Sequence, residues 1–483
     1  MLFLYLLNVR VLMIKVIRES KILNMIENIS QKTLIAEAVS TWSKKIPQEI
    51  EREMDDAEFE NKMKVIKEAV RDGYSSILEM PNIHVQAIMP RLDTLTLVSF
   101  STGANFLQQS LRYTVPLIKE EKEKFSYVFI PNSLKSKENA IIKHVEKGFE
   151  LYNELVQNLN VLETRKPEED ARYHLPICIG TFISASLNLS HIVHMLSLIK
   201  VHEENNIPIP STWKCFVEEL VNKISYKEFV YNIAKEIKIG KFYPNSYPLI
   251  TNNIMKKIEK DFEINGKNEI KLLNYNLKIL EYFTKDEIRN IIIKGINNGE
   301  FNDFSDIVFE FAVKESGIAR HQIIRHRTIQ QQSISIYDVA KRSEILIPAS
   351  IKQSKLINHY VDYLNNSISL YEDLRNESQN DAVLILPSNL AFVSKLRIDG
   401  YNIFNFRGFL GNRCCELAQA ETQLIASLIN NKIKEVFEKE GYKELTYILH
   451  ANCFKLRKCP ELIERAMYCS IFKNKSFEKP LFS

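Results

Sequence analysis

Two segments of the sequence carry the same anchor residues in the same order, and this repetition limits the possible folds more than any other feature. The Gly-to-Ser spacing is 37 residues in the first segment and 36 in the second. One shared glycine or proline is common by chance, whereas four ordered anchors at similar spacing predict a tandem duplication. The matched anchors are Gly73 with Gly299, Ser110 with Ser335, Leu175-Pro176 with Leu386-Pro387, and Asn188 with Asn402.

The composition is typical of a globular protein and excludes several other classes. The chain has 483 residues, of which 45% are hydrophobic and 26% charged, and its formal net charge is +4. This balance excludes disordered, collagen-like and disulfide-framework proteins. At about 100–200 residues per domain, the length predicts two to four domains. The small positive charge argues neither for nor against an anionic partner.

The cysteines and the first residues indicate a cytoplasmic protein without a metal site. None of the seven cysteines forms a Cys-x-x-Cys motif, and no histidine pair stands near them at zinc-site spacing. Residues 1–14 are apolar but are interrupted by Arg10. They are too short to span a membrane and lack a small-residue cleavage site. We expect an N-terminal extension that runs into a strand at 11–17, with a signal peptide as the alternative, and no membrane partner.

A segment rich in glycine, proline and polar residues separates two halves of similar size. This segment, residues 236–268, holds two glycines and two prolines and is the best candidate for a linker. The predicted organisation is an extension at 1–14, a first domain at 15–235, a linker at 236–268 and a second domain at 269–483. Apolar periodicity predicts helices at 56–72, 137–162, 187–198 and 421–439, and strands at 83–89 and 306–313. The expected fold class is α+β, with a sheet flanked by helices in each half.

The densest group of hydrogen-bond donors is Arg-His-Gln-Ile-Ile-Arg-His-Arg at residues 320–327. A guanidinium fork suits a phosphate or a pyrimidine carbonyl, and histidine adds a donor whose charge depends on pH. The same composition is also typical of a solvated basic turn or of a nucleic-acid-binding patch.

The residues around this cluster resemble the flavin-dependent thymidylate synthase family. The hallmark of that family is Arg-His-Arg, a serine about seven residues later, and then Arg-Tyr. Residues 322–328, followed by Ser335, are similar to the start of the hallmark, and Gln-Gln-Ser-Leu-Arg-Tyr at 108–113 is similar to its end. Residues 73–79 resemble the family's Gly-His-x-Ser-Val-Leu-Glu-His, and residues 413–421 its Arg-Cys-Cys-x-x-Ala-Gln-x-Glu. The resemblance therefore covers nearly the whole chain, twice over.

Each half departs from the hallmark, and the departures are complementary. The first half has Phe-Ser-Thr at 100–102 in place of Arg-His-Arg, but it keeps Arg172 before Leu-Pro. The second half keeps the triplet, but Tyr337-Asp338 replaces the terminal Arg-Tyr and Val383 replaces the arginine before Leu-Pro. In the family, neighbouring subunits share each active site. The resemblance thus implies one composite site between the halves and a decayed pseudosymmetric mate.

The resemblance also implies roles for individual residues. Arg413 is the expected catalytic residue, stabilising charge on the uracil ring. The residues expected to bind dUMP are Gln108, Ser110, Arg112, Arg172, Gln322, Arg325 and Arg413, and those expected to bind FAD are Ser76, Asn188, His194, Arg325, His326 and Arg327. His194 is equally consistent with a plain core histidine. No metal is expected.

Some of these residue types also have plainer explanations. We expect Ser110 to bond a phosphate or its own loop rather than act as a nucleophile. Cys414 and Cys415 are expected to be small packing residues on a helix, and His191 a core histidine. Asn402 borders the decayed site, which favours a structural role.

The resemblance implies an enzyme that makes dTMP from dUMP, with FAD as cofactor and with methylene-tetrahydrofolate and NADPH as co-substrates. Two chains are expected to form a homodimer equivalent to the family's tetramer. Two alternatives remain open: a catalytically dead paralogue that still binds flavin or nucleotide, and a nucleic-acid-binding protein that uses the basic triplet.

Overall fold

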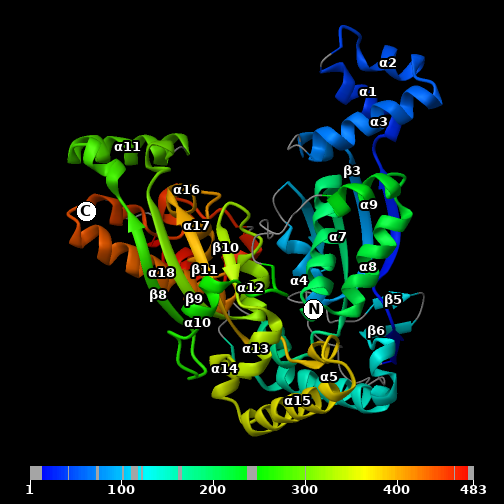
Figure 1. The fold of residues 1–483 in the computed structure, drawn as a ribbon. Coiled ribbons are helices and arrows are strands. Elements are labelled where there is room, and N and C mark those ends of the chain that lie inside the picture. The colour runs from blue at the N-terminus through cyan, green and yellow to red at the C-terminus, as the bar shows by residue number, and fades with distance from the viewer. Residues whose placement is uncertain are drawn as a thin grey trace.

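The computed structural model describes residues 13–41, 43–71, 75–100, 103–109, 118–120, 123–161, 166–236, 247–299, 301–461 and 463–476. Each half is built on a four-stranded antiparallel sheet, and the two sheets are separate (Figure 1). The first has the order β2 (Lys21–Glu27), β3 (Asn82–Pro90), β7 (Gly180–Asn188), β4 (Asn105–Gln108). The second has the order β8 (Glu269–Asn276), β9 (Val308–Ser316), β11 (Ala391–Asp399), β10 (Gln330–Ser333). A third sheet joins β1 (Met13–Ile17), β6 (Glu123–Phe129) and β5 (Ile118–Glu120).

The two sheets share strand order, register and irregularity, as a tandem duplication predicts. Nine consecutive residue pairs join β3 to β7, and nine join β9 to β11. The outer strand of each sheet contains a bulge, between Ile22 and Asn24 in β2 and between Leu272 and Asn274 in β8. An extra residue at the same strand of both sheets is a feature of the fold that both halves have kept.

The register corrects one anchor of the predicted repeat. Asn82 lies opposite Asn188 at the end of the first sheet, and Val308 lies opposite Asp399 in the second. The equivalent of Asn188 is therefore Asp399, not Asn402. Both residues are helix N-caps whose side chains accept the backbone N–H three residues later, from His191 and Asn402 respectively. Asn and Asp fill this position equally well, so a search for a repeated asparagine missed it.

Helices surround each sheet. In the first half they are α1 (Gln31–Ser40), α2 (Pro47–Glu53), α3 (Asp56–Arg71), η1 (Ser75–Glu79), α4 (Arg91–Ser99), η2 (Asn132–Lys137), α5 (Glu138–Asn158), α6 (Pro167–Ala171), η3 (Arg172–His174), α7 (Leu189–Glu204), α8 (Ser211–Lys223) and α9 (Lys227–Glu236). The second half has α10 (Asn253–Glu259), η4 (Lys278–Tyr282), α11 (Lys285–Asn298), η5 (Asn302–Phe304), α12 (Gly317–Ile323), α13 (Ile336–Arg342), α14 (Ala349–Lys352), α15 (Ile357–Glu377), η6 (Ala382–Ile385), α16 (Gly400–Phe404), α17 (Phe409–Arg413), α18 (Ala420–Lys439), η7 (Lys443–Ile448), α19 (Asn452–Leu456), α20 (Ile463–Ala466) and α21 (Ser470–Lys473). Among the described residues, no helix is long and apolar enough to cross a membrane.

Most expected elements are present, but several details were wrong. The helix expected at 137–162 is α5, which ends at Asn158. The helix expected at 187–198 begins only at Leu189, because β7 continues through Asn188. Cys414 and Cys415 do not lie on a helix: Cys414 caps the C-terminus of α17, and Cys415 lies in the turn that leads to α18. The strand expected at 306–313 is β9, which runs from Val308 to Ser316.

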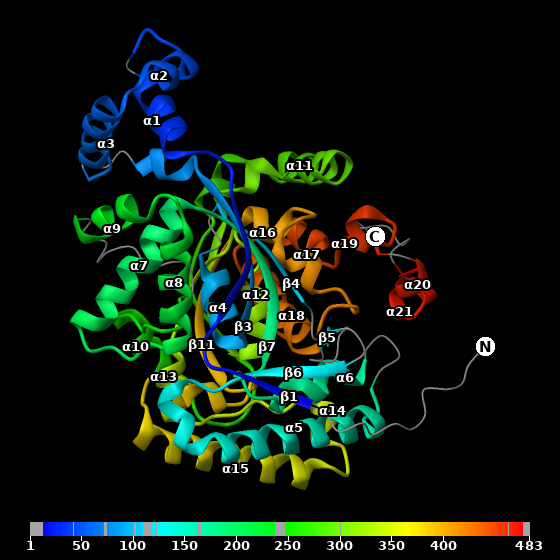
Figure 2. The same ribbon diagram turned by 90° about the vertical axis from the view of Figure 1, so that its right-hand side faces the viewer.

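The two halves pack on each other through matching elements. Helices α5 and α15 are both 21 residues long and lie side by side below the sheets (Figure 2). The ring of His144 on α5 stacks on Tyr363 of α15 at a centroid distance of 4.5 Å. The two Leu-Pro segments pair antiparallel, with Pro176 opposite Pro387. A pseudo-twofold axis therefore runs between the two Leu-Pro segments and brings residues of both halves together there.

The described part of the segment expected to be a linker is packed rather than exposed. Residues 247–268 include α10, and Tyr247, Leu249, Met255 and Phe262 are all buried in the larger core. Apolar residues in a linker gain stability by packing, and here they join a core to which both halves contribute. The domain boundaries given above stay predictions.

Candidate functional site

A cavity of about 260 Å³ lies at the junction of the halves and is lined from both sides. Every predicted dUMP-binding residue that the structure describes lines this cavity: Gln108 and Arg172 from the first half, and Gln322, Arg325 and Arg413 from the second. Ser110 and Arg112 lie outside the described residues. The lining residues that are described include four arginines and no Asp or Glu. Such a cavity favours an anionic ligand.

Gln108 connects the two halves at this cavity. It stands at the end of β4, and its Oε1 accepts hydrogen bonds from His321 Nε2 at 2.7 Å and from Arg325 Nη2 at 2.5 Å. Its Nε2 donates to Thr94 Oγ1 at 3.2 Å, which fixes the orientation of the amide. Burial and then the charges of nearby arginines, Arg325 first, hold the pKa of His321 well below its usual range. His321 is therefore neutral and carries its proton on Nε2.

His326, the central residue of the Arg-His-Arg triplet, holds the side chain of Arg413 in place. Arg413 Nε donates to His326 Nε2 at 2.8 Å, so His326 must be neutral and protonated on Nδ1. Burial, and secondly the charge of Arg413, lower the pKa of His326 to about 3. The ring of Phe409 packs edge-on against His326 at 5.1 Å. Arg413 thus enters the cavity wall from α17 with its side chain aligned by the triplet.

Arg172 and Val383 occupy equivalent positions with different chemistry. Both stand in a 3-10 turn, η3 or η6, three residues before the Leu-Pro segment. Arg172 is buried, lines the cavity and donates from Nε to Glu169 O at 3.2 Å. Val383 is fully buried in the apolar core. The cation therefore stands on one side of the pseudo-twofold axis and is missing from the equivalent position on the other.

The residues expected to bind FAD lie outside the 260 Å³ cavity, with the exception of Arg325. Asn188 caps α7, and η1, which carries the exposed Ser76, packs against the same helix. His194 is half-buried on α7, where burial and the neighbouring His191 lower its pKa to about 4. Arg327 reaches this region from the second half, because its Nη1 donates to Asn105 Oδ1 on β4 at 2.8 Å.

This donor set is compatible with a flavin dinucleotide. Arg325 and Arg327 present exposed guanidinium groups at the junction of β4 and the second half. A diphosphate requires such cationic donors, because they pair with its oxygens in a bidentate manner. The described residues contain no group of three or more His, Cys, Asp or Glu side chains able to hold a metal ion.

Among the polar residues that line the cavity, motif reasoning gave no role to Arg91, His321 and Ser388. His321 belongs to the basic cluster but was given no role. Arg91 follows Pro90 directly at the end of β3, and the register makes Gly317 its equivalent in the second half. If the two halves had been aligned with each other, the replacement of a glycine by Arg91 could have revealed this residue.

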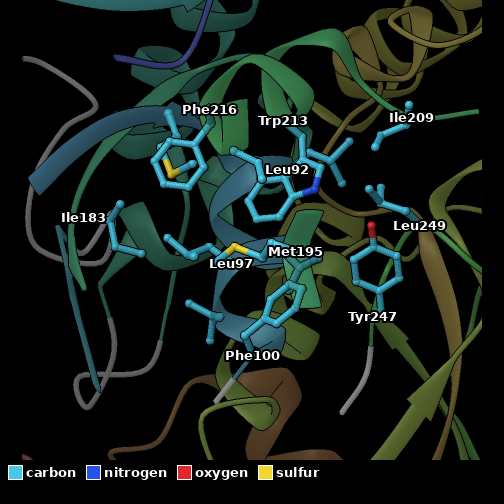
Figure 3. Packing of buried hydrophobic residues seen from close by; sticks show 14 of the residues in the cluster. Leu92, Leu97, Phe100, Ile183, Met195, Ile209, Trp213, Phe216, Tyr247 and Leu249 are labelled. Atoms are coloured by element: carbon cyan, nitrogen blue, oxygen red, sulfur yellow. The ribbon is translucent and has the colours of Figure 1, made fainter. Parts of the chain in front are cut away.

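The pseudosymmetric mate of the cavity is filled by side chains and by the linker. Figure 3 shows Phe100, Trp213 and Tyr247 packed in this region, with the Phe100 ring 6.2 Å from Trp213 and 6.1 Å from Tyr247. Ser335, the equivalent of Ser110, donates its N–H to Thr251 Oγ1 at 2.6 Å and its hydroxyl to Asp338 at 2.9 Å. The donors that would face a phosphate in the mate site are therefore already bonded.

A buried carboxyl group in this filled region gives the protein a measurable pH dependence. Asp93 is fully buried, and burial raises its pKa to about 8, although Ser20 Oγ donates to it at 2.8 Å. The folded state keeps the proton that the unfolded state loses above pH 4, so the free energy of unfolding falls as the pH rises toward 8.

We expect Asp93→Asn to remove this contribution, since Asn still accepts the Ser20 hydrogen bond but does not ionise. Urea unfolding at several pH values should show the variant gaining up to about 1.4 kcal/mol per pH unit over the wild type between pH 5 and 8. The difference in unfolding free energy between variant and wild type cancels the contributions of other buried carboxyl groups. One of these is Glu315, because burial raises its pKa to about 7. A constant difference across that range would contradict a protonated Asp93.

These features define a duplicated α+β protein with one basic cavity between its two halves. The chain belongs to the family described as thymidylate synthase complementing protein, whose model matches residues 21–206 and again residues 260–438. Two separate matches to one family model fit the duplication, and the predicted α+β class is confirmed.

Two relatives, both flavin-dependent thymidylate synthases by name, agree with this assignment. The flavin-dependent thymidylate synthase of Pyrococcus abyssi is 27% identical over 224 residues, which are 43% of this chain and 88% of the relative. The enzyme of the same name from Pyrococcus furiosus is 25% identical over 198 residues, 39% of this chain and 79% of the relative. A UMP/dUMP methylase from Streptomyces cacaoi, solved with 5-bromo-dUMP, is 12% identical with a TM-score of 0.34, covering 48% of this chain and 98% of its own.

Proposed function

We propose that the protein is a flavin-dependent thymidylate synthase that makes dTMP from dUMP, with methylene-tetrahydrofolate and NADPH as co-substrates, at one composite site per chain. One observation carries the proposal: the described dUMP-binding motif residues that the two halves have kept line a single cavity, while the equivalent position is filled. A basic cavity without a carboxylate among its described lining residues suits a nucleotide monophosphate.

The cavity residues divide the work between the two ends of dUMP. Arg172, together with Ser110 and Arg112, which follow β4 in the sequence, would hold the phosphate by charge-assisted hydrogen bonds. Gln322, Arg325 and Arg413 would face the uracil ring. Negative charge must build up around N3, C4 and O4 of uracil as C5 becomes nucleophilic. Arg413, kept in line by His326, would stabilise that charge.

Ser76, Asn188, His194, Arg325, His326 and Arg327 would hold FAD next to this cavity. When bound, FAD supplies the redox chemistry of the reaction, taking reducing equivalents from NADPH. The protein holds and orients the flavin. Arg325 is bonded to Gln108 and Arg327 to Asn105, so both guanidiniums are fixed against the first half.

The proposal includes a cytoplasmic homodimer of two chains, equivalent to the four units of the family's tetramer. It also predicts yellow protein as purified, with a flavin absorbance that dUMP perturbs. Flavin-containing protein that binds dUMP without turnover would instead identify a catalytically dead paralogue, and colourless protein that binds nucleic acid would identify the remaining alternative.

The number of dUMP sites tests the composite arrangement. Calorimetric titration should give one dUMP per chain, and Arg172→Ala should weaken binding by about 10- to 100-fold, because it removes a charged partner of the phosphate. Tyr337→Phe is the matched control: it alters the filled mate region, keeps the packing and should leave dUMP affinity unchanged. Two equivalent sites per chain, or dUMP binding by each half alone, would contradict the proposal.

A further inference from the structure

Arg91 is a buried arginine that the sequence motifs do not mark. It is the first residue of α4, lines the cavity and is 8% exposed. Its Nη1 donates to Ser388 Oγ at 2.9 Å, and Ser388 Oγ in turn donates to Leu175 O at 2.8 Å. Ser388 belongs to the second half, next to the paired Leu-Pro segments. The guanidinium is therefore fixed to both halves at the pseudo-twofold axis.

This arrangement exists on one side of the axis. The equivalent of Arg91 is Gly317, and the equivalent of Ser388 is Ile177, so the other side has neither the cation nor its acceptor. Gly317 lines the same cavity, and a Cβ there would lie 2.8 Å from Ser388 O. Because residue 317 is a glycine, its backbone can approach the backbone of Ser388, the residue that binds Arg91. The arginine stands on the same side as Arg172, where the cavity has survived.

The charge of Arg91 has no carboxylate to balance it among the described residues. No ion pair of the described chain includes Arg91, and none of the described residues that line the cavity is acidic. Burial, and then the positive charge of Arg172, lower the pKa of Arg91 to about 9. Two buried guanidinium groups close enough to repel each other are costly unless an anion lies between them.

We propose that Arg91 is a further phosphate-binding residue, which contacts the dianionic phosphate of the nucleotide together with Arg172. The inference rests on the proposed function for the identity of the nucleotide, dUMP. Ser388 acts as a positioning residue, because its hydroxyl accepts the hydrogen bond that orients the guanidinium. The site would then discriminate strongly between a nucleoside monophosphate and the nucleoside that lacks the phosphate.

The test compares dUMP with deoxyuridine as ligands of the flavin-loaded protein, measured by the change in flavin absorbance. Arg91→Met keeps the length of the side chain without its charge. It should weaken dUMP binding at least about tenfold and leave deoxyuridine binding unchanged, since only dUMP carries the phosphate. Ser388→Ala should weaken dUMP binding less, and Arg407→Met, an exposed arginine that does not line the cavity, should have no effect.

Equal losses for both ligands would overturn the inference, because Arg91 would then support the site rather than the phosphate. Unchanged dUMP affinity in Arg91→Met would overturn it as well. Thermal unfolding with inorganic phosphate separates the inference from the proposed function. If phosphate stabilises the wild type but not Arg91→Met, while dUMP binds neither protein better than phosphate, the anion site stands and the proposed function fails.

Discussion

Replacing Arg413 with alanine should lower the rate of dTMP formation by about 100-fold or more, while the affinity for dUMP falls much less. The guanidinium is aimed into the cavity by its hydrogen bond to His326, whose neutral ring is packed against Phe409. Its attraction for the ligand grows as charge develops on the uracil ring. Single-turnover absorbance of the reduced flavin, followed beside dUMP titration, separates the two quantities.

Arg407→Ala provides the matched control for this prediction. Arg407 precedes α17 on the same segment but is exposed and does not line the cavity. Its replacement should leave both rate and affinity unchanged. If Arg413→Ala weakened dUMP binding by as much as it slowed the reaction, Arg413 would bind the ground state and the transition state equally, contrary to its proposed role.

Replacing Arg325 with alanine should abolish activity and also release flavin from the protein. Arg325 lines the cavity and is bonded to Gln108 across the junction of the halves, so it is placed to contact both nucleotide and flavin. Arg325→Lys should not restore function, because a point charge lacks the two parallel donors of the guanidinium. The flavin content of the purified variants, measured from their absorbance, reports the loss directly.

Arg397→Ala is the control for Arg325. Arg397 is an exposed arginine of the same half, on β11, where it contacts Gln330 and Glu310 rather than the first half. Retained flavin and unchanged dUMP affinity in Arg325→Ala would contradict the placement of the triplet.

The sequence predicted those features of the site that are encoded by motifs, in which particular residues follow one another in a fixed order. These residues are Gln108 on β4, Arg172 on η3, Gln322 on α12, Arg325 in the turn after α12 and Arg413 on α17. The resemblance to a family whose subunits share each active site was enough to predict that they meet. The duplication was likewise visible, because the spacing between anchors is set by the lengths of strands and helices that both halves share.

Other features depend on contacts that no local pattern encodes. Asp399 caps its helix in the same way as its equivalent, Asn188, so a comparison of residue types between the halves does not identify the pair. The role of Arg91 depends on Ser388, almost 300 residues later in the chain. Thr251 lies in a segment whose glycines and prolines indicate a linker, yet its hydroxyl bonds Ser335 because tertiary packing decides where such a segment lies.

The pairing of the two Leu-Pro segments has a consequence for behaviour at low concentration. Ile177 N donates to Leu386 O at 2.9 Å, and Ser388 N donates to Leu175 O at 3.1 Å, so the cavity is closed by contacts within one polypeptide. Two connected halves meet at an effective concentration of about millimolar, whatever the concentration of the protein itself. A site shared by separate subunits comes apart on dilution, whereas this one should keep its geometry in a cell that holds only a few copies of the chain.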